Sequence, residues 1–108
     1  MIFDAHADIL TDIYEEKSKK KGTSFKDKHL AKYKKSGITH SIFVNWTDPF
    51  TRTRKDFYDC FDVAIDEIKK NNDVLSICYH YNDILKAQVE NKIGVILGIE
   101  GVKYLDTP

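Results

Sequence analysis

Three residues near the amino end of the chain, Asp4, His6 and Asp8, stand two positions apart within the segment 2–10. On a β-strand, residues two apart project from one face, so the three side chains would share a face while apolar residues cover the other. The Cα atoms of His6 and Asp8 would lie about 6.6 Å apart, a spacing that lets an imidazole nitrogen and a carboxylate oxygen bind one metal ion. This pattern favours a metal-dependent enzyme. A solvated strand face without chemistry is the alternative.

A second candidate ligand, Glu100, directly follows the apolar run 93–99. This run is apolar on both of its strand faces, which is typical of a strand in the middle of a buried parallel sheet. A carboxylate at the carboxyl end of such a strand, between Gly98 and Gly101, occupies the place where α/β folds collect catalytic residues. An acid that caps a helix or lies in a surface loop is the alternative.

The composition restricts the class of protein. The 108 residues predict one domain, 1–108, and the 17 basic and 17 acidic residues give a formal net charge of zero. The basic runs 17–21 and 26–35 lack the interleaved aromatics of a nucleic-acid groove, so we expect no nucleic-acid partner. No segment resembles a membrane span or an export signal, which predicts a cytoplasmic protein without a membrane partner. Cys60 and Cys78 are predicted to be reduced and to pack as small apolar residues.

Strand and helix signals alternate along the chain, which is typical of βα units around a parallel sheet. The clearest element is a helix over 54–70, because its apolar residues recur at a spacing of three and four. Gly37 is predicted to end a helix over 26–36, and Asn82 or Asp83 to begin one that reaches about residue 91. The other predicted elements are strands over 2–10, 38–46, 74–79 and 93–99, a helix over 11–21, and a loop at 22–24.

The chain resembles the membrane (renal) dipeptidase family of metallopeptidases over nearly its whole length. The resemblance lies in "DAHADIL" at the first strand, "HLAKYKKSGITHSIFVNW" in the middle and "ILGIEG" at the last strand. It implies an α/β fold made of the N-terminal βα units of a (β/α)8 TIM barrel of the metal-dependent hydrolase type. We expect that barrel to be incomplete in this chain, since a full one takes about 250 residues. It further implies a site for two Zn²⁺ ions that hydrolyses small dipeptides, often with a C-terminal D-residue, through a metal-activated water.

The resemblance also assigns roles to individual residues. His6 and Asp8 match the pair that binds one zinc, and Glu100 matches the carboxylate that bridges both zincs. Asp4 is expected to orient His6 without binding a metal itself. The family's two histidine ligands, its substrate-contacting histidine and its proton-handling aspartate all lie further downstream, so we expect one zinc or none to bind this fragment and no dipeptidase turnover. The remaining histidines do not match those positions and are expected to be structural or surface residues: His29, His40 and His80.

The sequence is also compatible with two other functions, and it predicts that the chain either associates with itself or lacks a C-terminal segment. Phosphoesterases with a D-x-H-x-H motif on the first strand are a second hydrolase class, although Asp8 stands where their second histidine would be. A non-catalytic α/β interaction domain derived from a metal-dependent hydrolase is the alternative from another class. An incomplete barrel has open sheet edges, which predicts either self-association or a missing C-terminal segment.

Overall fold

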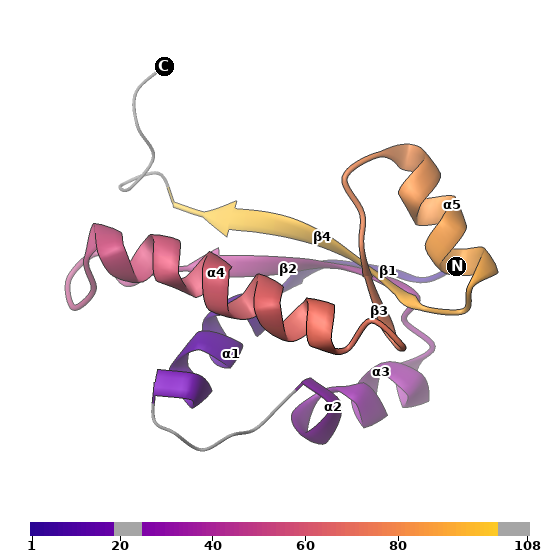
Figure 1. Cartoon of the computed structure of the whole chain (residues 1–108), viewed down its shortest axis with the longest axis horizontal. Coiled ribbons are helices and arrows are strands. Elements are labelled where there is room, and N and C mark those ends of the chain that lie inside the picture. Colours follow the sequence, from indigo (N-terminus) through magenta and orange to yellow (C-terminus); the bar gives the residue numbers. More distant parts are fainter. Residues whose placement is uncertain (19–24, 102–108) are drawn as a thin grey trace.

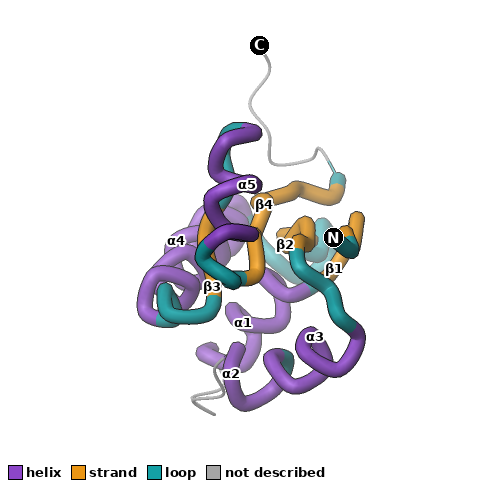
Figure 2. The backbone as a smooth tube through the Cα atoms, turned by 90° about the vertical axis from the view of Figure 1, so that its right-hand side faces the viewer, coloured by secondary structure: helices purple, strands orange, loops and turns teal. Residues whose placement is uncertain are grey.

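The computed structural model describes residues 1–18 and 25–101 and contains one parallel sheet flanked by helices (Figure 1). Within the described residues the elements follow in the order β1 (Phe3–Ala7), α1 (Ile9–Ser18), α2 (Phe25–Lys28), α3 (Leu30–Ser36), β2 (His40–Trp46), α4 (Arg54–Lys70), β3 (Leu75–Ile77), α5 (Tyr81–Val89) and β4 (Ile93–Glu100). Helices α1 to α4 lie on one side of the sheet, and α5 lies on the other side (Figures 1 and 2). The predicted α/β class with a parallel sheet is confirmed.

The strand order is β1-β2-β4-β3, with every neighbouring pair parallel. Strand β2 pairs with β4 along the whole length of β2, from His40 beside Gly94 to Trp46 beside Glu100. Strand β3 is only three residues long and pairs with the first three residues of β4. Consecutive strands of a (β/α)8 barrel are neighbours, so β3 departs from that pattern. The longer strands β1, β2 and β4 therefore form the main part of the sheet, and β3 is a short edge strand beside β4.

The hydrophobic core lies between the sheet and helices α1 to α4. Phe43 of β2 is fully buried there, and its ring centroid lies 5.8 Å from that of Phe25 and 6.1 Å from that of Tyr33. Cys60 and Cys78 are free and buried, as predicted. Burial raises the pKa of the Cys60 thiol to about 12, which keeps the thiol protonated and unreactive at neutral pH. None of the described helices is long and apolar enough to cross a membrane.

Two helix predictions are confirmed in detail. Helix α4 has the predicted bounds, and Thr53 caps its first turn by accepting the Asp56 N–H while the Asp56 carboxylate accepts the Thr53 N–H. Gly37 ends α3 with φ of 75°, a left-handed conformation that glycine adopts without steric cost. Local signals determine both features, so the sequence alone is sufficient to predict them.

Other boundaries differ from the predictions. The first strand ends at Ala7 and α1 begins at Ile9, because Ile9, Leu10 and Ile13 are buried together at helical spacing. The second predicted helix is two helices that meet at His29.

The last helix and the remaining strands also shift by a few residues. Helix α5 begins at Tyr81, after His80, so neither Asn82 nor Asp83 is its cap; the Asp83 carboxylate instead accepts the N–H of His80. Strand β2 begins at His40, and β3 is shorter than the predicted strand over 74–79. The predicted loop at 22–24 and the end of the helix predicted over 11–21 lie outside the described residues.

Candidate metal centre

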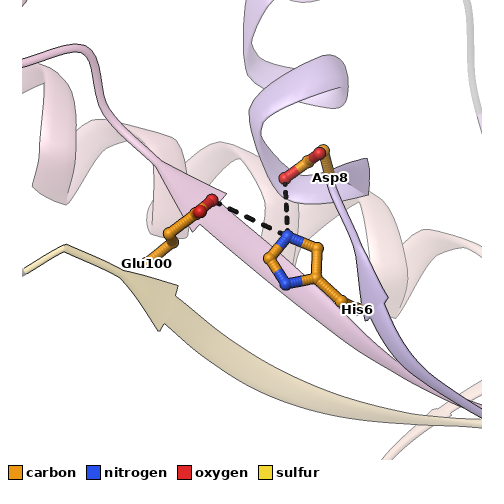
Figure 3. A group of neighbouring side chains, drawn as sticks. All are labelled: His6, Asp8 and Glu100. Atoms are coloured by element: carbon orange, nitrogen blue, oxygen red, sulfur yellow. Dashed lines mark hydrogen bonds and ion pairs between the residues drawn. The ribbon is translucent and has the colours of Figure 1, made fainter.

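Three side chains from two distant parts of the chain meet at the carboxyl end of the sheet (Figure 3). His6 comes from β1, Asp8 from the turn between β1 and α1, and Glu100 from the last position of β4. His6 Nε2 lies 3.2 Å from Asp8 Oδ1 and 3.7 Å from Glu100 Oε2. One ligand atom from each of the three residues lies within 4.8 Å of the other two. The side chains point toward a common centre.

The parallel pairing explains why residues from opposite ends of the sequence meet. Glu100 pairs with Trp46 at the carboxyl end of β2, and β2 separates β4 from β1. The carboxyl ends of parallel strands lie at the same edge of a sheet, which is where α/β proteins place their active sites. A cavity of about 460 Å³ opens beside the group and is lined by Asp8, Thr11, Glu15, Trp46 and Glu100. The site therefore has room for a small ligand next to the two carboxylates.

The Thr11 side chain connects the start of α1, next to Asp8, to the end of β2, next to Glu100. Its Oγ1 accepts the backbone N–H of Trp46 at 2.8 Å and donates to the carbonyl of the same residue at 3.0 Å. Strand β1 pairs with β2 only as far as Phe43, so the Thr11 hydroxyl replaces the missing ladder partner of Trp46. This contact ties the start of α1, directly after Asp8, to the strand end beside Glu100. No sequence signal identified Thr11.

Asp4 does not share a face with His6 and Asp8, so that expectation is wrong. Asp4 pairs with Ser41 and Ala7 with Phe43, and the pairing register shifts between these two pairs. Ser41 faces the helices, because its Oγ accepts the hydroxyl hydrogen of Tyr33 on α3. Asp4 therefore lies on the helix side of the sheet. Its Oδ1 accepts the backbone N–H of His6 at 3.1 Å, so this bond is to the peptide group and not to the imidazole ring.

The donor set suits a divalent cation. An imidazole nitrogen and carboxylate oxygens are ordinary zinc ligands, and three protein ligands with a position open to water form a recognised catalytic arrangement. The side chains of His6, Asp8 and Glu100 are 51%, 66% and 50% exposed, so solvent reaches the centre. Within the described residues, neither carboxylate pairs with a lysine or arginine. A cation would therefore relieve the repulsion between Asp8 and Glu100.

The other three histidines lie elsewhere. His29 Nε2 lies 2.7 Å from Asp12 Oδ2 on the helix side, where α2 and α3 meet α1. His40 is fully buried at the amino end of β2 and stacks on Phe3 with ring centroids 5.4 Å apart. His80 precedes the first residue of α5. Among the described residues, none of them joins the His6, Asp8 and Glu100 group.

The fold and the site together define a parallel α/β protein with a candidate metal centre at the carboxyl edge of its sheet, as in metal-dependent hydrolases. All 108 residues match the family described as membrane dipeptidase, peptidase family M19, and the chain belongs to this family. The resemblance seen in the sequence is thereby confirmed.

A solved structure agrees with this assignment at the level of the fold. It is described as the crystal structure of the dipeptidase AC, a metallopeptidase of family M19, and it is 13% identical with a TM-score of 0.78. The match covers 95% of this chain and 36% of that chain, so this chain spans about a third of the length of that dipeptidase. A search of curated proteins found no match.

Proposed function

We propose that this chain is the N-terminal part of a zinc-dependent dipeptidase and that His6, Asp8 and Glu100 hold the metal. The convergence of these three side chains within 4.8 Å is the observation that carries the proposal, and membership of the family supports it. When bound, zinc supplies a polarised substrate carbonyl and a water of lowered pKa that is ready to attack it. The substrates would be small dipeptides, including those with a C-terminal D-residue.

The chain's own residues would have distinct tasks in this reaction. The imidazole of His6 and the carboxylates of Asp8 and Glu100 would hold the ion, because each offers one ligand atom to the common centre. The 460 Å³ cavity would receive the dipeptide beside the ligands, with the half-exposed Trp46 as one wall. The resemblance places further histidine ligands beyond these residues. We therefore propose that the 108-residue chain binds at most one zinc and hydrolyses no dipeptide by itself.

Zinc binding to the 108-residue chain tests the ligand assignment. We expect isothermal titration to give one zinc per chain, and His6→Ala, Asp8→Ala and Glu100→Ala each to weaken binding by about tenfold or more. Asp62→Ala is the matched control, because Asp62 is an exposed carboxylate on α4 with no part in the site. Equal affinity in Glu100→Ala and the wild type would contradict the proposed site. Retention of no zinc after dialysis would instead favour a non-catalytic interaction domain.

We also propose that the chain self-associates through the edge of β4. Strand β3 covers only the first three residues of β4, so within the described residues positions 96–100 have no strand neighbour on that side. Unpaired strand edges readily add another strand. Gel filtration should give a dimer or larger species, and a monomer at all concentrations would contradict this proposal.

A further inference from the structure

Between two pairs of neighbouring residues in the sheet, strand β1 contains one residue more than strand β2. Asp4 pairs with Ser41 and Ala7 pairs with Phe43, so Ala5 and His6 together lie opposite the single residue Ile42. Two residues opposite one define a β-bulge, which bends the strand and redirects its side chains. The bulge thus includes the candidate ligand His6 and lies two residues before Asp8.

The bulge determines which face His6 and Asp8 occupy. Asp4 and Ala7 both lie on the helix side of the sheet, although residues three apart in a regular strand point to opposite faces. If regular alternation continued from Asp4, His6 and Asp8 would also point toward the helices. Glu100 lies on the other face, where its Oε2 is 3.7 Å from His6 Nε2. A register shift of one residue moves every following side chain to the opposite face, so the bulge is what brings His6 and Asp8 to Glu100.

One side chain stabilises this bulge. A bulge disrupts the ladder and leaves a backbone group without its strand partner. The N–H of His6, inside the bulge, is donated to Asp4 Oδ1 at 3.1 Å. Asp4 is only partly exposed, and it is the last residue that pairs regularly with β2 before Ala5 and His6. Its carboxylate therefore holds the backbone of His6 in the bulged conformation.

We propose that Asp4 is a positioning residue whose carboxylate holds the β1 bulge and thereby keeps His6 on the face that carries Glu100. Its consequence for zinc binding rests on the proposed function, whereas the conformational statement does not. The acceptor oxygen, and not the negative charge, is what the bulge requires. Asparagine at position 4 would keep that oxygen, and alanine would remove it.

Two variants of Asp4 and a control variant test whether the acceptor oxygen of Asp4 holds the bulge. Asp4→Ala should abolish the nuclear Overhauser effects between the His6 ring and the Glu100 side chain in the metal-free protein, and Asp4→Asn should preserve them. Asp48→Ala is the matched control, because Asp48 Oδ1 makes the same kind of bond to the N–H two residues on, that of Phe50, at 2.8 Å. It should preserve the Overhauser effects. Wild-type Overhauser effects in Asp4→Ala, or their absence from Asp4→Asn, would overturn the proposal.

A measurement on the wild-type chain keeps the proposal testable if Asp4→Ala does not fold. The His6 amide should exchange its hydrogen at least about tenfold more slowly than an unstructured amide because it is bonded to Asp4. Exchange at the unstructured rate would overturn the proposal.

Zinc titration then tests the link to function. Asp4→Ala should bind zinc about tenfold more weakly, within the range usual for residues that orient ligands, while Asp4→Asn stays close to the wild type. If the wild type binds no zinc, the proposed function fails while the Overhauser effects still decide the role of Asp4. If the wild type and Asp4→Ala bind zinc equally, the proposed function stands and the positioning role fails.

Discussion

Replacing Thr11 by valine should loosen the connection between the two halves of the candidate metal centre. The Thr11 hydroxyl accepts the Trp46 N–H and donates to the Trp46 carbonyl, at a place where β1 no longer pairs with β2. Valine has the same branched shape but no hydroxyl, so Thr11→Val removes these two bonds with little change in packing volume. The backbone of α1 next to Asp8 would then be free to move relative to the strand end next to Glu100.

The magnitude follows from the two bonds. An intramolecular hydrogen bond contributes about 0.5–1.5 kcal/mol net, so two of them contribute about 1–3 kcal/mol. Trp46 is 42% exposed, and water can replace part of what its backbone loses. We therefore expect the free energy of unfolding to fall by about 1–2 kcal/mol, which is the lower part of the range of about 1–3 kcal/mol for two bonds. For a domain of this size, each kcal/mol lowers the melting temperature by about 4–8 °C.

Urea denaturation and zinc titration of the same protein measure the two consequences. The unfolding free energy should fall by about 1–2 kcal/mol, and zinc affinity should fall by about tenfold because the supports of the ligands are less fixed. Ser36→Ala is the control, since it removes a hydroxyl that bonds only within its own helix, to the carbonyls of Lys32 and Tyr33. That variant should change stability by less than about 0.5 kcal/mol.

The Thr11 reasoning has a clear point of failure. If Thr11→Val unfolds at the same urea concentration as the wild type and binds zinc equally well, the hydroxyl does not hold the site together. A loss of stability without a loss of zinc affinity would show that Thr11 stabilises the fold only. Comparison with Ser36→Ala separates either result from the general effect of removing a hydroxyl.

Two further predictions concern stability. Gly94→Ala should destabilise the fold by about 1–3 kcal/mol in urea denaturation, because the added Cβ would lie 2.4 Å from Cδ2 of the fully buried His40; wild-type stability would contradict this. Burial acts to raise the pKa of Asp12, but its hydrogen bonds to Lys28 and His29 outweigh burial and lower that pKa below the ordinary 3.8. Asp12 therefore contributes stability fully above pH 3.8 and loses it as the pH falls through the lowered folded-state pKa. Asp12→Asn should show a shallower loss of unfolding free energy on acidification below about pH 4, and an unchanged pH profile would refute this.

The elements that the sequence predicts well are those whose signals are local. Helix α4 has the predicted bounds because its apolar face repeats over seventeen residues and Asp56 stands three positions after Thr53. Glu100 follows a run that is apolar on both faces, and the structure places the start of that run between β2 and β3. Such patterns determine the element without any contact from elsewhere.

The start of α1 depends on contacts that the local pattern does not contain. Ile9 and Leu10 fit an apolar strand end or the first turn of a helix equally well. Burial of Leu10 and Ile13 on one helical face decides between the two, and that burial exists only when the sheet and α4 are in place. The strand prediction therefore extends too far, from Ala7 to Leu10.

The candidate ligands are identified from the sequence for a reason that also explains the error about Asp4. Residue type and spacing select His6 and Asp8, and a bulge formed by Ala5 and His6 still leaves the side chains of His6 and Asp8 on one face. The same bulge reverses the alternation between Asp4 and His6, because one extra residue in β1 lies opposite β2. A prediction from alternation uses the residues of one strand only. It cannot detect that this strand has one residue more than its partner, because the partner strand lies much further along the chain. The sequence therefore selects the candidate ligands and Asp4 by residue type, but it does not reveal that Asp4 bonds to a peptide N–H, because any residue other than proline at position 6 would supply that N–H.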